Sequence, residues 1–122
     1  MRGIKGAAVV AALFALTGCG GGPSADCISL DRDAAQAVQD GADGDLAVGQ
    51  GKAVRADSGV YYAAFTINAA GSDEVGVWAF DNLPPTSIRA VDGYAQQFTV
   101  WPTLEGANAS PDARAAEACL DQ

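Results

Sequence analysis

The 122-residue sequence contains no histidine. This absence excludes Ser-His-Asp and Cys-His catalysis, the zinc-protease helix and imidazole metal sites. A Ser/Lys pair is disfavoured as well, because Lys52 is the only lysine after residue 18 and no serine precedes it by three positions. Hydrolysis by paired carboxylates stays open, although no two acidic residues are singled out by spacing.

Basic residues are also scarce. After residue 18, five arginines and lysines stand against all fifteen acidic residues, which gives a net charge of −10. Nucleic-acid binding depends on Lys and Arg that neutralise phosphates, so we expect no nucleic-acid partner. Anionic lipid would likewise repel this surface. The simplest interpretation of the acidity is solubility.

The N-terminal segment has the pattern of an export signal. Arg2 and Lys5 precede an apolar run over residues 7–16, which is shorter than the roughly 20 residues of a membrane span. The following Leu16-Thr17-Gly18-Cys19 resembles the lipobox of bacterial lipoproteins. The resemblance implies cleavage after Gly18 and attachment of diacylglycerol, with chains such as palmitate, to Cys19. An ordinary secretory signal with a chance cysteine is the alternative.

This reading divides the chain into a signal peptide at 1–18, a lipidated Cys19 with a flexible tether at 19–26, and one domain at 27–122. We expect a lipid-anchored protein on the extracytoplasmic side of the cell membrane. The tether is Gly-rich and spans only about 25 Å when stretched, so the domain lies close to the bilayer.

The three cysteines are an odd number for an exported protein. Lipidation of Cys19 would leave Cys27 and Cys119, which an oxidising envelope would join as a disulfide. Two buried free thiols are the alternative.

The domain is predicted to be α+β, with a three-stranded antiparallel meander, an N-terminal helix and two C-terminal helices. Leu30, Ala34 and Val38 have helical spacing, with Ser29 or Asp31 as the cap and Gly41 as the stop. Three strands are expected at 45–56, 59–68 and 74–82, separated by short turns. The glycines at 49 and 51 superficially resemble a phosphate loop but are more typical of a strand with a bulge.

The C-terminal third is predicted to contain two helices. Ile88, Val91, Ala95 and Phe98 follow a helical period that favours a helix over 87–101, although the Asp92-Gly93 pair could instead join two strands. Ser110 and Pro111 are typical of a helix start. They predict a terminal helix with Ala116, Cys119 and Leu120 on one side.

Two further groups are candidate sites. Asp40, Asp43 and Asp45 resemble a calcium loop weakly, because the spacing differs from an EF-hand and no bidentate Glu follows; a polar turn is favoured. Trp78 and Phe80 share a strand face and, with Tyr62, could form an exposed interaction patch. Burial in the core is favoured, since so small a domain needs its aromatics for stability. No cofactor is indicated.

Several segments resemble small lipoproteins of high-GC actinobacteria that have no assigned activity. They are Val77-Trp78-Ala79, Ile88-Arg89-Ala90-Val91-Asp92 leading to Phe98 and Trp101, and Ala118-Cys119-Leu120. The resemblance implies an exported α+β domain and supplies no catalytic residue. Taken with the residue patterns, it favours a non-enzymatic binding module that meets an envelope protein near the membrane. A small hydrolase with catalytic carboxylates is the alternative, and carboxylates of raised pKa in a cleft would distinguish it.

Overall fold

The computed structural model describes residues 26–107 and 110–121. The predicted signal peptide, Cys19 and the tether as far as residue 25 therefore lie outside the described residues. Within the described part, no helix has the length and apolar character needed to cross a membrane.

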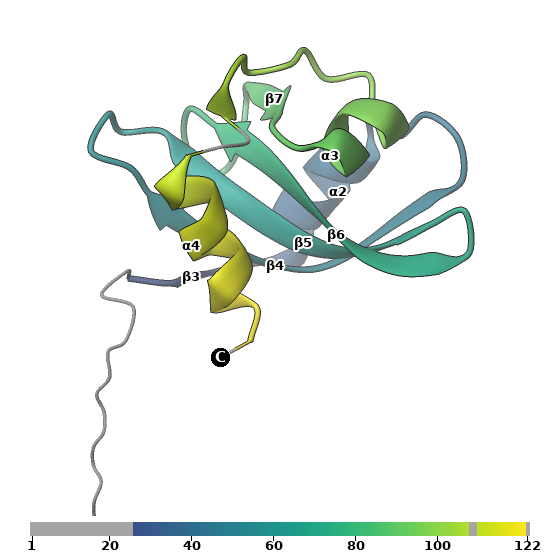
Figure 1. The fold of residues 1–122 in the computed structure, drawn as a ribbon, viewed down its shortest axis with the longest axis horizontal. Coiled ribbons are helices and arrows are strands. Elements are labelled where there is room, and N and C mark those ends of the chain that lie inside the picture. Colours follow the sequence, from purple (N-terminus) through teal and green to yellow (C-terminus); the bar gives the residue numbers. More distant parts are fainter. Residues whose placement is uncertain (1–25, 108–109, 122) are drawn as a thin grey trace, which may run out of the picture.

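The domain is α+β, as predicted, and is built on a five-stranded antiparallel sheet in which the strands follow chain order (Figure 1). The strands are β3 (Ile28–Leu30), β4 (Leu46–Arg55), β5 (Tyr61–Ala69), β6 (Ser72–Phe80) and β7 (Ile88–Ala90). The helices are α2 (Arg32–Gln39), α3 (Gly93–Phe98) and α4 (Pro111–Cys119). In Figure 1, α4 crosses one face of the sheet and α2 lies behind the other.

The three long strands confirm the predicted meander. β5 and β6 pair without interruption from Tyr61 opposite Phe80 to Ala69 opposite Ser72. The two-residue turn between them places Ala70 and Gly71 at positive φ, which matches the twist of a tight hairpin. The β4–β5 register shifts between Val48 and Gly51, so the expected bulge is present.

The sheet has two more strands than predicted, and both are short edge strands. Leu30 ends β3 and does not begin a helix; Asp31 caps α2 by accepting a hydrogen bond from the Ala34 N–H at 3.0 Å. The prediction of a single helix over 87–101 is wrong. Residues 88–90 form a strand that pairs with β6, and the helix starts only at Gly93. Three-residue strands are too short to show a period of two, which explains both errors.

The sheet is covered on both faces. On one face, α2 and α3 pack against alternate residues of β5 and β6 and form the first core cluster. On the other face, α4 packs against the intervening residues of these strands and forms the second cluster. Trp78 and Phe80 belong to the first cluster, and both side chains are 0% exposed. They are therefore core residues, which is the alternative that the sequence favours, and they form no exposed patch. Tyr62 is half-buried on the opposite face. The indole N–H of Trp78 donates to Thr99 Oγ1 at 3.2 Å, which satisfies this buried polar group.

The terminal helix and the disulfide agree with the predictions. Ser110 caps α4 through a 3.1 Å bond from the Asp112 N–H, and Pro111 occupies the first turn. Cys119, at the end of α4, is bonded to Cys27, and their Cα atoms lie 5.7 Å apart. The bond closes a loop with a sequence separation of 92, so it joins the two ends of the described domain.

Candidate functional site

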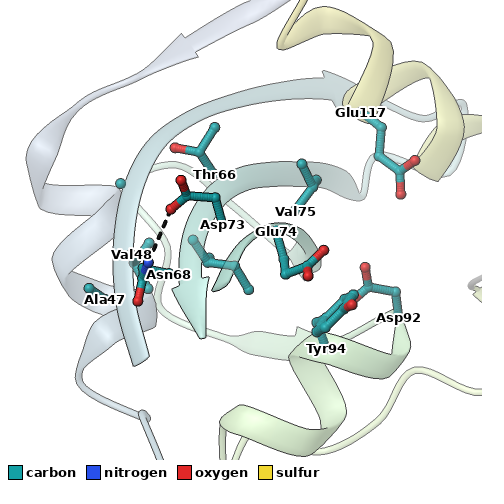
Figure 2. Close-up of a pocket in the computed structure, with 12 residues that line it drawn as sticks. Ala47, Val48, Thr66, Asn68, Asp73, Glu74, Val75, Asp92, Tyr94 and Glu117 are labelled. Atoms are coloured by element: carbon teal, nitrogen blue, oxygen red, sulfur yellow. Dashed lines mark hydrogen bonds between the residues drawn. The ribbon is translucent and has the colours of Figure 1, made fainter. Parts of the chain in front are cut away.

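An open pocket of about 930 Å³ lies beside α4, next to the long strands of the sheet (Figure 2). Its floor comes from β4, β5 and the start of β6, and its rim from α4 and the N-terminus of α3. The lining residues are Ala47, Val48, Gly49, Thr66, Ile67, Asn68, Asp73, Glu74, Val75, Asp92, Tyr94 and Glu117.

Asp92 is positioned by the end of β7 and the start of α3. The Val91 N–H donates to the Val77 carbonyl at 3.0 Å, which extends the β7 pairing by one residue. The Asp92 carboxylate then accepts from the Ala95 N–H at 2.9 Å as the cap of α3, and also from the Val77 N–H. Burial raises the pKa of Asp92 above its ordinary value, although these hydrogen bonds oppose the shift.

Tyr94 and Glu74 face one another across the rim. Tyr94, in the first turn of α3, is one of two large hydrophobic residues that are exposed in the described part of the chain. The charge of Glu74, together with a hydrogen bond between the two side chains, raises the pKa of the Tyr94 phenol. Figure 2 shows both side chains beside Asp92.

Glu117 reaches toward the same rim from α4 (Figure 2). Burial raises the pKa of Glu117, and the nearby charge of Asp92 adds to the shift, whereas Arg114 opposes it. Glu117 and Asp92 thus lie close enough to repel each other, although they belong to different helices. The result is a pocket with a concentrated negative potential.

The floor of the pocket combines apolar and polar surface. Val48, Ile67 and Val75 contribute aliphatic surface, while the Asn68 amide donates to Asp73 Oδ1 at 3.0 Å. Of the residues that line the pocket, four are acidic and none is Lys or Arg. Such a site suits a ligand that carries positive charge on an apolar stem.

Most of this site was missed by the sequence analysis. Glu74, Asp92 and Glu117 come from three separate elements, and their spacing along the chain carries no periodic signal. Only the capping role of Asp92 could have been recognised, because Asp ahead of a periodic apolar segment is typical of a helix start.

The calcium candidates do not assemble into a site. Asp40 follows α2 and accepts a hydrogen bond from Gln36 Nε2 at 2.9 Å, while Asp43 and Asp45 are exposed in the turn before β4. Across residues 26–107 and 110–121, no group of three His, Cys, Asp or Glu residues is arranged to hold a metal ion. The favoured reading of a polar turn therefore fits this segment.

Comparisons of the chain with known protein families, with curated proteins and with solved structures find no match. The functional proposals below therefore depend on the residues and their geometry.

Proposed function

We propose that this protein is a lipid-anchored, extracytoplasmic binding module whose pocket holds a positively charged ligand. The anchor follows from the resemblance of Leu16-Thr17-Gly18-Cys19 to a lipobox. Membrane attachment would come from the lipid on Cys19, because a domain of this charge is repelled by anionic lipid.

The observation that carries the binding function is the charge of the pocket. Asp73, Glu74, Asp92 and Glu117 line one open hollow that no basic lining residue neutralises. The exposed ring of Tyr94 adds a surface to which cations are attracted. Apolar residues on the floor would pack against the stem of a lysine-like group while the carboxylates hold its charged end.

The pocket lies at the far end of the sheet from the point where the tether joins. Asp26 shares a hollow with Arg55 at the end of β4, whereas Ala47, Val48 and Gly49 at the start of β4 line the acidic pocket. The strand between Gly49 and Arg55 spans about 20 Å at roughly 3.3 Å per residue. Attachment at Asp26 would thus leave the pocket uncovered by the tether and open to a partner in the envelope.

Binding can be tested with the mature chain in non-ionic detergent and a short lysine-rich peptide, by calorimetry at low salt. A double Glu74→Gln/Glu117→Gln variant should weaken binding at least about tenfold, since it removes two charges from the rim. The matched control is Asp57→Asn/Glu105→Gln, which changes net charge equally at exposed turns away from the pocket. Equal weakening in both variants, or no binding to the parent chain, would reject the proposal.

A small hydrolase is the second candidate, and the raised pKa values of Asp92 and Glu117 favour it. We rank it lower because the Asp92 carboxylate already accepts from the Ala95 and Val77 N–H groups, which favour its ionised form. Release of nitrophenol from nitrophenyl glycosides, abolished by Glu117→Gln and unaffected by Glu105→Gln, would reverse this ranking.

A further inference from the structure

The outer edge of β6 is covered by β7 along only part of its length. β7 pairs with Trp78, Ala79 and Phe80. On this side the Val91 N–H donates to the Val77 carbonyl at 3.0 Å, and the Asp81 N–H donates to the Ser87 carbonyl at 3.4 Å. The odd-numbered residues of β6 therefore direct their backbone groups outward, because orientation alternates along a strand.

The next odd-numbered residues, Val75 and Asp73, have no strand beside them in the described part of the chain. The chain leaves the sheet after Val91, where the Asp92 carboxylate takes the Val77 N–H that a continuing strand would have bonded. β5 pairs with β6 throughout, yet by the same alternation it cannot use the outward N–H and C=O groups of these two residues. Four backbone groups along this edge thus have no partner among the described residues.

This free edge borders the acidic pocket. Asp73, Glu74 and Val75 are all lining residues of the pocket, and Glu117 faces them from α4. A strand added here would point the side chains opposite Asp73 and Val75 toward the Glu117 side, because directly opposed residues share a face. The unpaired backbone groups of β6 and the acidic side chains of the pocket therefore lie next to one another.

We propose that the pocket binds an extended basic peptide segment, which adds to the sheet as a strand along residues 73–75 of β6. This inference deepens the proposed function and depends on it. Backbone hydrogen bonds to Asp73 and Val75 supply the register, and lysine or arginine side chains at alternate positions meet Asp73 and Glu117. The occupant is therefore a basic β-forming segment of another envelope protein.

The test uses a hexapeptide of alternating lysine and valine, in two backbone-methylated forms, with the mature chain in non-ionic detergent. Lysines facing Glu117 lie opposite Asp73 and Val75, so their own N–H groups bond β6, whereas the valine N–H groups face solvent. Methylation of the lysine amides should weaken binding at least about tenfold, and methylation of the valine amides less than about threefold. A glutamate–valine hexapeptide should not bind.

Amide hydrogen exchange provides a readout on the protein. The Val75 amide should exchange freely in the unbound chain and become protected when the lysine–valine peptide binds, while Ala64, in the centre of the sheet, stays protected throughout. A Val75→Pro variant removes the outward N–H without removing a bond to β5 and should weaken binding by about tenfold.

The outcomes separate the two proposals. Spermine, a polyamine that carries positive charge but has no peptide backbone, is the comparison ligand. If spermine and both methylated peptides bind as well as the parent peptide, and binding still depends on Glu74 and Glu117, then charge alone holds the ligand and the proposal of strand addition is wrong. If the lysine–valine peptide does not bind at all and spermine does, strand addition is again wrong and the cationic pocket stands. If neither cation binds, the proposed function fails as well.

Discussion

Gln39 in α2 supplies hydrogen bonds to the part of β4 that the short strand β3 leaves uncovered. The Val48 N–H donates to Gln39 Oε1 at 2.8 Å, and Gln39 Nε2 donates to the Leu46 carbonyl at 2.8 Å. β3 pairs only with residues 51–53 of β4, so the side-chain amide occupies the place of a continuing edge strand. One side chain therefore fixes the helix to the sheet and satisfies two backbone groups.

Replacing Gln39 by alanine should lower the free energy of unfolding by about 1–3 kcal/mol, because two part-buried backbone groups lose their partners. Urea unfolding measures the change. Gln36→Ala is the matched control on the same helix, since Gln36 makes only an exposed bond to Asp40, and it should cost less than about 0.5 kcal/mol. Equal losses in the two variants would contradict the role of Gln39.

Substitution of Ala70 by asparagine should increase the stability of the domain. Ala70 has a φ of 52° in the hairpin turn, a conformation that costs an ordinary residue about 1–2 kcal/mol and that asparagine tolerates better. We expect Ala70→Asn to stabilise the domain by about 0.5–1 kcal/mol, a rise in Tm of a few degrees. Ala47→Asn, at an exposed position within β4, is the control and should bring no gain.

Loss of the disulfide should be the most damaging single change among these predictions. Cys27→Ser/Cys119→Ser should lower the free energy of unfolding by about 2–5 kcal/mol, because the closed loop is long. Reductant should shift the unfolding midpoint of the parent chain to that of the variant and leave the variant unchanged. An unchanged midpoint in reduced parent chain would count against this prediction.

The pH dependence of the pocket follows from the raised pKa values of Asp92 and Glu117. A carboxyl group with a higher pKa in the folded state binds its proton more tightly there than in the unfolded chain. Each carboxyl group therefore contributes most to stability when it is protonated. This contribution falls as the pH rises from the ordinary pKa values, 3.8 for Asp92 and 4.5 for Glu117, through the raised pKa values of the folded state. This direction is opposite to that of a salt-bridged carboxylate.

The coupling of the two acids gives a direct test. Asp92→Asn should lower the pKa of Glu117, because it removes a nearby negative charge that raises this pKa. Carboxyl-carbon NMR during a pH titration measures the shift. Asp57→Asn makes the same change of charge in the turn between β4 and β5, and should leave Glu117 unchanged; similar shifts in both variants would show that the effect is not local.

The lipid anchor can be tested independently of the pocket. A Cys19→Ala precursor should lose its lipid and its association with membranes, since in our proposal two or three acyl chains on Cys19 would provide the attachment and the acidic domain would provide none. Membrane fractionation followed by a salt wash measures this. Cys27→Ser should remain in the membrane fraction, and persistence of Cys19→Ala there after the wash would refute lipid anchoring.

The parts of the fold that could be predicted from the sequence carry strong local signals. β5 is rich in residues that favour strands, both turns that flank β5 contain glycine, and Ser110-Pro111 marks the start of α4. The sequence predicts the disulfide because lipidation of Cys19, if it occurs, would leave only one pair of cysteines. These features depend on neighbouring residues or on simple counting.

The remaining features depend on tertiary contacts. Leu30 fits either a helix or a strand, and pairing with Gly51 decides the matter in favour of β3. Ile88 continues a helical spacing toward Ala95, yet pairing with Phe80 makes it part of β7. The acidic pocket arises only when α4 crosses the sheet and places Glu117 near enough to Asp92 for their charges to interact, and no local pattern relates these two residues.

The disulfide also determines how the domain would carry mechanical load. A pull applied at Asp26 would, without the Cys27–Cys119 bond, act on β3, which has only three paired positions with β4. With the bond in place, the same force is shared with α4, which packs against β4, β5 and β6. If the domain is anchored through its N-terminal tether, as we propose, it would be loaded through its core, and its edge strand would be protected from unzipping.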